Sequence, residues 1–370
     1  MQPISVCIIA KNEESRIEQC LSSLKPYGFE IVVVDTGSTD RTKEIAARYA
    51  DKVLDFAWCD DFSAARNYSL REASNNWIFM IDCDESVKYL DLEELTYFRK
   101  HLADSVGSVS RENLVTENGT LTLNNTDYTE RFFDRRLYRY TGIIHEQLTP
   151  IRGHEFPNYL LKTTLLHTGY DMTDAERDAK YQRNYNLLLK QLEQDSENPY
   201  LYYQLGKSCE ILKDYSRACE YYDKGLTFDL DPELAYVQAM VVSYGNALLC
   251  TGNAGTALGF EGIYEEFGNV TDFVYLMGNI YRENGMYEQA LMQYQKAVGM
   301  PPGKQNGTNS FLPVYQSGTI LETLGDMDSA IACYRQCTGF TPAEEKLTAL
   351  INAANKAANE RTATSDTETN

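Results

Sequence analysis

Short runs of hydrophobic residues near the N-terminus alternate with segments of mixed polarity. The runs Ile4–Ile9, Ile31–Val34 and Trp77–Ile81 have the length and the β-branched or aromatic content of buried strands. Asn12 stands where it can cap a helix after the first run. The apolar residues of that helix follow one face: Ile17, Cys20, Leu21 and Leu24. Strands that alternate with helices over short connections predict an α/β domain with a parallel sheet and right-handed crossovers.

Carboxylates follow two of these predicted strands. Asp35 comes directly after the second run, and Asp82-Cys83-Asp84 follows the third. In an open α/β sheet, ligands bind at the carboxyl edge of the strands, so we expect these residues to face one crevice. Carboxylate oxygens suit a hard divalent cation that also holds a diphosphate, which indicates a nucleotide-diphosphate substrate with Mg²⁺ or Mn²⁺. A role for Asp35 as a helix cap is the alternative.

Four motifs occur in the order seen in a known enzyme family: Ala10-Lys11-Asn12-Glu13, Val34-Asp35-Thr36-Gly37-Ser38-Thr39-Asp40, Phe62-Ser63-Ala64-Ala65-Arg66-Asn67 and Asp82-Cys83-Asp84. They resemble the family-2 glycosyltransferases of the GT-A fold over about the first 90 residues. The resemblance implies a Rossmann-like α/β domain that binds a nucleotide sugar. It also implies the following roles: Ala10, Asn12, Glu13 and Asp35 at the nucleoside, Arg66 and Asn67 near the sugar nucleotide, and Asp82 and Asp84 at the metal and diphosphate. A guanidinium pairs well with phosphate or carboxylate, and an ion pair of Arg66 with Asp60 or Asp61 is the alternative.

Two of the four histidines of the chain lie in distinctive surroundings. His145 and Glu146 follow a basic stretch and fit the acceptor side of a crevice. The family inverts by single displacement, so the resemblance implies one catalytic base, His145 or Glu146; the alternative is a structural role, with Glu146 held by Arg139. His167 follows an apolar run and resembles the later histidine that completes the metal site of some GT-A enzymes. Imidazole together with carboxylate favours Mn²⁺ over Mg²⁺.

The remainder of the catalytic region has weaker patterns. Val106–Ser110, Thr120–Leu123 and Glu130–Tyr138 have the composition of strands. Polar stretches at 117–119 and 124–127 predict turns between them.

An internal repeat begins at about residue 199. Gly206, Tyr215, Ala218 and Tyr222 recur 72 residues later as Gly278, Tyr287, Ala290 and Tyr294. This arrangement resembles the tetratricopeptide repeat, in which small residues let the two helices of each pair approach and tyrosines fill the gaps between pairs. The predicted organisation is a GT-A domain at 1–170, a linking helix at 171–198, repeats at 199–358 and a disordered, polar tail at 359–370.

The acidic charge of the chain is concentrated in its second part. Residues 1–170 carry a net charge of −7 and residues 171–370 one of −13. We therefore expect no nucleic acid partner; the acidic repeats fit a basic peptide or a face kept for solubility. The nine scattered cysteines, the lack of a signal-peptide pattern and the lack of a long apolar run predict a cytoplasmic protein without a transmembrane segment.

Tetratricopeptide repeats bind extended peptides, so their presence beside a sugar transferase predicts a peptide or protein acceptor. The layout resembles the bacteriocin S-glycosyltransferases, the family of the enzyme that modifies sublancin. We therefore expect a metal-dependent inverting enzyme that moves a sugar, with UDP-hexose as the expected donor, to sulfur or oxygen of a peptide. A transferase for cell-envelope polysaccharide or lipooligosaccharide and a catalytically silent repeat scaffold are the alternatives, and a homodimer through the repeats stays open.

Overall fold

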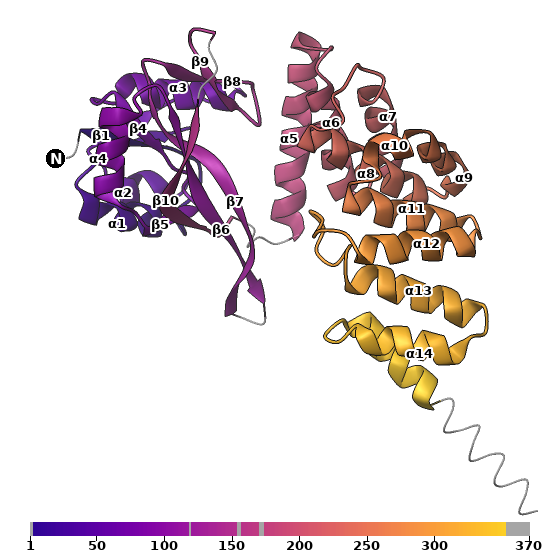
Figure 1. The fold of residues 1–370 in the computed structure, drawn as a ribbon. Helices are drawn as coiled ribbons and strands as arrows, with labels where there is room; N and C mark the ends of the chain where they lie inside the picture. Colours follow the sequence, from indigo (N-terminus) through magenta and orange to yellow (C-terminus); the bar gives the residue numbers. More distant parts are fainter. Residues whose placement is uncertain (1–2, 118–119, 154–156, 170–173, 353–370) are drawn as a thin grey trace, which may run out of the picture. The chain divides into compact units, whose positions relative to one another are not determined.

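The structure, a computed structural model, describes residues 3–117, 120–153, 157–169 and 174–352. The chain divides into two compact units, Met1–Asp195 and Ser196–Asn370 (Figure 1). The region predicted to be a linking helix forms α5, Asp174–Gln194, and this helix lies within the first unit. The predicted disordered tail, 359–370, lies outside the described residues.

A mixed sheet of eight strands forms the centre of the first unit. The strands lie in the order β3 (Lys52–Asp55), β2 (Glu30–Asp35), β1 (Ile4–Ala10), β4 (Trp77–Met80), β7 (Thr120–Asp134), β6 (Val106–Glu117), β10 (Asn158–His167) and β5 (Glu85–Tyr89). The four strands from β3 to β4 are parallel, as predicted. The prediction of a parallel sheet fails beyond β4, because β7 pairs with β4 in the antiparallel direction. The carboxyl ends of β1, β2 and β4 therefore share one edge.

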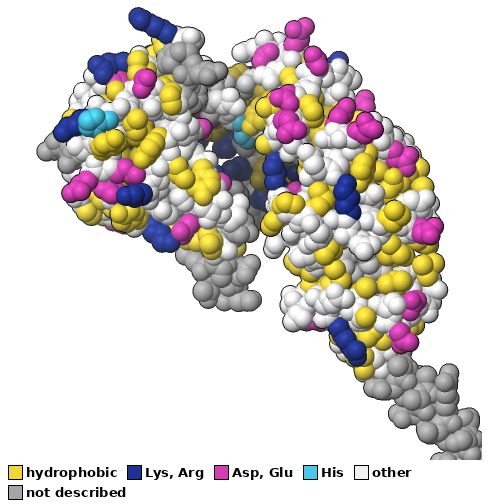
Figure 2. Space-filling view, viewed as in Figure 1, with side chains coloured by type: hydrophobic (Ala, Val, Ile, Leu, Met, Phe, Trp, Pro, Cys, Tyr) yellow, Lys and Arg dark blue, Asp and Glu magenta, His cyan; other side chains and the backbone are white. Residues whose placement is uncertain are grey.

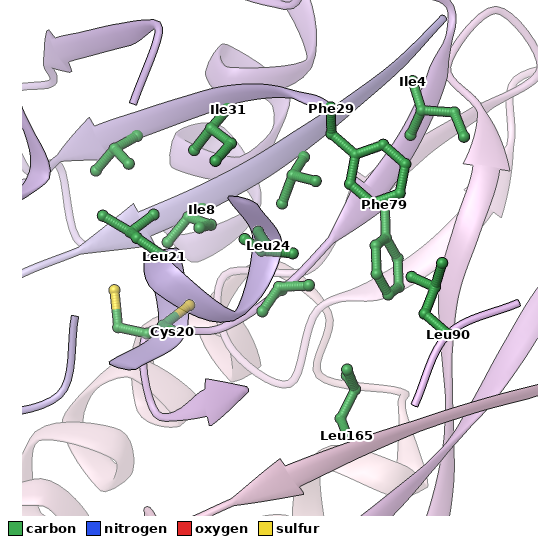
Figure 3. Close-up of a cluster of buried hydrophobic side chains, with 14 of the residues drawn as sticks. Ile4, Ile8, Cys20, Leu21, Leu24, Phe29, Ile31, Phe79, Leu90 and Leu165 are labelled. Atoms are coloured by element: carbon green, nitrogen blue, oxygen red, sulfur yellow. The ribbon is translucent and has the colours of Figure 1, made fainter. Parts of the chain in front are cut away.

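The first unit packs its helices against this sheet. These are α1 (Ile17–Leu24), α2 (Thr42–Ala46), α3 (Phe62–Glu72) and α4 (Leu92–His101), with a short 3-10 helix at Lys25–Tyr27. The predicted apolar face of α1 is buried in the core, where Leu21 and Leu24 lie close to Ile8 and Ile31 (Figure 3). Burying a leucine or isoleucine side chain stabilises the fold by roughly 1.5–3 kcal/mol.

Asn12 does not cap α1, contrary to the prediction. The helix begins after Arg16, and no side chain caps it. Asn12 has a φ of 55°, and its Oδ1 accepts a hydrogen bond from the backbone N of Thr39 at 2.8 Å. The side chain therefore ties the end of β1 to the turn after β2.

The predicted turn at 124–127 is also wrong. Residues 120–134 form the single strand β7, which pairs with β6 along most of its length. Polar positions of β7 face polar positions of β6: Asp127 lies opposite Arg111, whose Nη2 is 2.8 Å from Asp127 Oδ2. Cross-strand ion pairs stabilise a strand whose polar composition resembles a turn.

A small hairpin separates β7 from β10. Its strands are β8 (Tyr138–Thr141) and β9 (Gln147–Pro150). The connection between them carries His145 and Glu146.

The second unit is helical. It contains α6 (Pro199–Ile211), α7 (Tyr215–Gly225), α8 (Ala235–Cys250), α9 (Ala254–Ala257), a 3-10 helix (Leu258–Ile263), α10 (Tyr264–Phe267), α11 (Thr271–Glu283), α12 (Tyr287–Val298), α13 (Phe311–Thr323) and α14 (Met327–Gln336). None of the helices in the described ranges has the length and apolar content needed to cross a membrane. Figure 2 shows Asp and Glu side chains of this unit in small separate groups among apolar and uncharged surface. On the face that Figure 2 shows, that spacing favours the solubility role over one continuous acidic binding strip.

A glycine packed on a tyrosine joins the two helices of a repeat. A Cβ at Gly206 would lie 2.2 Å from the ring of Tyr222, closer than van der Waals contact allows. The tyrosine ring is buried and occupies the space that the glycine leaves. The same pairing recurs down the unit: Gly206 with Tyr222, Gly278 with Tyr294 and Gly318 with Tyr334. The predicted role of the small residues is thus confirmed, whereas these tyrosines fill the gap within each helix pair and not, as predicted, the gaps between pairs.

Candidate active site

A crevice of about 480 Å³ lies at the carboxyl edge of β1 and β4 in the first unit. Its lining includes eight of the residues predicted to be functional: Ala10, Glu13, Arg66, Asp82, Asp84, His145, Glu146 and His167. These residues come from five places in the chain that are distant in sequence. The fold therefore brings together most of the predicted site.

Asp82 is the centre of a buried network of charges. Its Oδ1 accepts from Nη2 of Arg66 at 2.8 Å, and its Oδ2 accepts from Nη2 of Arg131 at 2.7 Å. Burial alone would raise the pKa of Asp82, but the charges of Arg131 and Arg66 outweigh it and hold the pKa well below its usual value. Arg131 also donates to Oε1 of Glu85 at 2.6 Å. Asp82 is thus charged, and both of its oxygens are already engaged.

Arg66 joins two parts of the crevice. Its Nη2 binds Asp82, and its Nε lies 2.5 Å from Oε1 of Glu146. The alternative partners Asp60 and Asp61 are wrong: Asp60 pairs with Lys190, and Asp61 caps α3 through the backbone N of Ala64. The alternative partner of Glu146, Arg139, is also wrong, because Glu146 pairs with Arg66.

Asp84 and His167 face each other across the crevice. Oδ2 of Asp84 lies 3.4 Å from Nε2 of His167. The Nδ1 of His167 is 2.8 Å from Oδ1 of Asn113, and the Nδ2 of Asn113 donates to Oδ2 of Asp127 at 3.1 Å. Because Asp127 accepts from the amide NH₂, the carbonyl oxygen of Asn113 must point to His167, so Nδ1 carries the proton. The Nε2 that approaches Asp84 is then an acceptor.

Two acceptors at this distance need a positive charge between them. A bound cation would supply it. Gly169 keeps space beside the pair, because a Cβ there would lie 2.2 Å from Asp84 Oδ2 and 2.5 Å from His167 Nε2. Burial raises the pKa of Glu13, and the nearby charge of Asp84 adds to that rise. The charge of Arg16 opposes it.

The donor set fits a divalent cation only in part. Within the ranges that the structure describes, no group of three metal-ligating side chains stands together. Asp84 and His167 form a pair of oxygen and nitrogen ligands, whereas Asp82 is held by two arginines. Two protein ligands suit a cation whose other positions are filled by a diphosphate and water.

Three predicted residues do not line the crevice. Oδ1 of Asp35 accepts from the backbone N of Gly37 and of Ser38, so the aspartate stabilises its own turn; Oδ2 is buried without a partner. Asn12 ties the same turn to β1. The amide of Asn67 is committed to the backbone N and O of Tyr140.

His145 sits in the hairpin connection with a strained backbone. Its φ of 51° lies in the left-handed region, which non-glycine residues rarely adopt. Desolvation by surrounding atoms lowers the pKa of His145, and the charge of Glu146 opposes that effect. The imidazole is therefore neutral at pH 7 and able to accept a proton.

Helix α5 contributes a wall that the sequence reasoning missed. Lys180, Tyr181, Arg183 and Asn184 line the crevice. Burial lowers the pKa of Lys180, and the charge of Asp84 opposes that effect. Lys180 and Arg183, two cations three residues apart on one helix, are a sequence signal that could have identified this wall. Arg131 and Asn113 were missed as well, since each looks like any polar position in a half-exposed strand.

Family models match segments of both units. Residues 5–152 match the family model described as Glycosyl transferase family 2. Three segments of the second unit match the model described as Tetratricopeptide repeat, namely residues 199–232, 271–304 and 314–344. The first two of these segments begin 72 residues apart, as the predicted repeat does.

Several known proteins are similar to parts of this chain. A TPR repeat-containing protein of Synechococcus elongatus is 32% identical over 218 residues, covering 56% of this chain and 52% of the relative. The SPbeta prophage-derived glycosyltransferase SunS of Bacillus subtilis is 28% identical over 268 residues, covering 67% of this chain and 58% of SunS. An uncharacterized glycosyltransferase of Rickettsia typhi is 35% identical over 105 residues, covering 28% of this chain and 36% of the relative. The chain thus spans little more than half the length of the first two relatives.

Proposed function

We propose that this chain, which carries a family-2 glycosyltransferase domain followed by tetratricopeptide repeats, transfers a hexose from a nucleotide-diphosphate sugar to a peptide or protein. The proposed donor is a UDP-hexose, and the acceptor atom is sulfur or oxygen. The observation that carries the proposal is the approach of Asp84 and His167 beside the Arg66–Asp82–Arg131 network. It provides a place for a cation beside ordered guanidinium groups, and such a cation can bind a diphosphate.

A divalent cation, Mn²⁺ or Mg²⁺, is part of the proposal. Asp84 and His167 would hold it, and Asn113 fixes the His167 tautomer that can bind a metal. When bound, the ion offsets the negative charge that develops on the leaving diphosphate. Lys180 lines the same crevice and adds positive charge near Asp84.

The proposed reaction is an inverting single displacement with one base. Glu146 and His145 are the candidates, since both line the crevice. Arg66 fixes Glu146 by its contact with Oε1, which positions the carboxylate. The neutral imidazole of His145 is better matched to a thiol, whose ordinary pKa is about 8.5, than to an alcohol.

A groove in the second unit is the proposed acceptor platform. It has a volume of about 670 Å³ and lies along α6, α8 and the start of α11. Its polar lining includes the amides of Gln238, Asn246, Asn269 and Gln305, and its charges are balanced, with Lys207 paired to Glu210. Amide side chains can both donate to and accept from a peptide backbone. This lining favours an extended neutral peptide over the basic peptide first considered.

The proposal is tested by incubating the full chain with a panel of UDP- and GDP-sugars and Mn²⁺. Release of nucleotide without acceptor would identify the donor, and mass spectrometry with Cys- and Ser-containing peptides would identify the linkage. Failure to bind or hydrolyse any sugar nucleotide would contradict the proposed function and favour a repeat scaffold.

A further inference from the structure

A second cavity adjoins the crevice in the first unit. It has a volume of about 370 Å³, and Arg66 and Glu146 line both spaces. The rest of its lining comes from β7, β8 and β9: Thr129, Glu130, Arg131, Tyr140, Gln147 and Leu148. A group that leaves the crevice past Arg66 and Glu146 would therefore enter this cavity.

Three residues that line the cavity each carry a buried polar atom with no hydrogen-bond partner in the described part of the chain. These atoms are Nη1 of Arg66, Nε of Arg131 and the hydroxyl oxygen of Tyr140. These residues are 8%, 5% and 6% exposed. Most buried polar groups in proteins are paired, because an unmet donor is costly. Three such atoms around one cavity indicate a ligand with several hydrogen-bonding atoms.

The charges around the cavity favour a neutral ligand. Asp82 and Glu146 already balance Arg66, and Asp82 also pairs with Arg131. The unpaired N–H groups therefore require an acceptor atom but no further negative charge. Glu130 and Glu146 in the same lining would repel an anion. A polyhydroxyl group can accept from the N–H donors and donate to the carboxylates.

We infer that this cavity receives the sugar of the nucleotide-sugar donor and that Tyr140 and Arg131 help to select it. The inference rests on the proposed function, and neither residue belongs to the sequence motifs of the family. Tyr140 is held rigidly: the Arg66 guanidinium lies 5.3 Å from its ring centroid, and Asn67 bonds its backbone N and O at 3.0 and 2.8 Å. A rigid hydroxyl in the lining of this cavity can distinguish one sugar hydroxyl pattern from another.

The test compares Tyr140→Phe with the wild-type full chain. Dissociation constants are measured by calorimetry for UDP, GDP, UDP-glucose, UDP-N-acetylglucosamine and GDP-mannose with Mn²⁺. The variant should bind the sugar nucleotide about 3- to 10-fold more weakly, the loss expected for one hydrogen bond, and should bind the matching nucleoside diphosphate equally well. Because the Tyr140 hydroxyl has no hydrogen-bond partner among the residues that the structure describes, the variant should keep the unfolding temperature of the wild type.

The matched control is Tyr138→Phe, on the same strand. Its hydroxyl bonds to the backbone O of Asp104 away from the cavity, so this variant should lose stability but keep both affinities. Equal affinity of Tyr140→Phe and wild type for the sugar nucleotide, or an equal loss for the nucleoside diphosphate, would overturn the inference and indicate a cavity that holds water or the acceptor. Absence of sugar-nucleotide binding by the wild type would instead overturn the proposed function, and the inference with it.

Discussion

The guanidinium of Arg66 donates to the carboxylate of Glu146, and its Nε lies 2.5 Å from Oε1. The two residues are 80 positions apart in the sequence. The same guanidinium binds Asp82 through Nη2. One side chain therefore positions the hairpin carboxylate against the strand-end carboxylate. Glu146 enters the crevice at a fixed place, which a base in a single displacement requires.

The first prediction separates the two candidate bases. If Glu146 is the base, Glu146→Gln should lose transfer by about 10²- to 10⁴-fold, because general-base catalysis contributes about that much. Donor affinity should change far less than transfer, since Gln keeps the shape and a hydrogen-bonding oxygen. His145→Ala should then transfer at a near-normal rate. Nucleotide release and peptide product, measured side by side, check this.

The pH profile provides a second reading of the same question. The pKa of His145 lies below its ordinary value, because desolvation outweighs the charge of Glu146. If His145 is the base, transfer should stay constant near pH 7 and fall as the pH drops below 6.5 through that lowered pKa, and His145→Ala should remove that limb. If both variants transfer normally over the whole profile, neither residue is the base.

The second prediction concerns the metal. Asp84→Asn should reduce turnover by about 10³-fold, a loss typical of removing a group that stabilises developing charge. EDTA should abolish turnover of the wild type. Full activity in EDTA would exclude a metal role for Asp84 and His167.

The third prediction uses the space beside that pair. In Gly169→Ala the new methyl group would meet Asp84 Oδ2 and His167 Nε2, so Mn²⁺ affinity measured by electron paramagnetic resonance should fall. Gly153→Ala is the matched control, because a Cβ there meets nothing within 4 Å. Unchanged Mn²⁺ affinity in Gly169→Ala would place the cation elsewhere.

The fourth prediction concerns stability and pH. Burial would raise the pKa of Glu30, but hydrogen bonds from Ser5 and Ser74 and from Lys52 outweigh it and lower the pKa to about 2. The folded pKa lies below the unfolded value, so the stabilisation is fully present above pH 4.5 and is lost as the pH falls from 4.5 towards 2. Glu30→Gln should cost about 1.5–3 kcal/mol at pH 7, as expected for hydrogen bonds to a charged group.

Urea unfolding followed by tryptophan fluorescence measures this effect. Both tryptophans of the chain, Trp58 and Trp77, lie in the first unit, so the signal reports that unit. The difference between variant and wild type should shrink below pH 4.5. The exposed Glu93→Gln, in the same unit, should unfold like the wild type at every pH.

The fifth prediction tests the acceptor groove. Ala239 lines the groove, and Ala239→Arg should fill it and weaken peptide transfer about tenfold or more, equivalent to about 1.4 kcal/mol of binding. Hydrolysis of the sugar nucleotide should not change. Ala332→Arg, on an exposed position of α14 outside the groove lining, is the control. Equal peptide transfer by Ala239→Arg and wild type would exclude this groove as the platform.

The parts of the fold that the sequence could predict are those whose patterns are local. Helix α1 and the strands β1, β2 and β4 follow from apolar runs and spacing, and the Gly206–Tyr222 type of pair follows from a repeat. The motifs identify many of the crevice residues, because they lie at the carboxyl ends of strands that share one edge of the sheet.

The remaining parts depend on contacts between distant segments. The polar stretch at 124–127 forms a strand only because β6 offers complementary side chains, such as Arg111 for Asp127. The partner of Arg66 could not be read from its neighbours Asp60 and Asp61, since topology brings Glu146 closer. Arg131 gains its importance only from the pairing of β7 with β4, which places it at Asp82.

The paired residues are close in sequence in the second unit and far apart in sequence in the first unit. This difference has a consequence for folding. Each glycine–tyrosine pair, such as Gly206 with Tyr222, closes inside one helical hairpin, so repeats can form as soon as two helices exist. The crevice cannot assemble so locally. Arg66 can pair with Glu146 only after Glu146 has left the ribosome, and Asp84 can meet His167 only after His167 has left it. Until then the charges of these side chains stay in water. We expect the catalytic centre to be the last part of the first unit to become ordered and the first to be lost when that unit is destabilised.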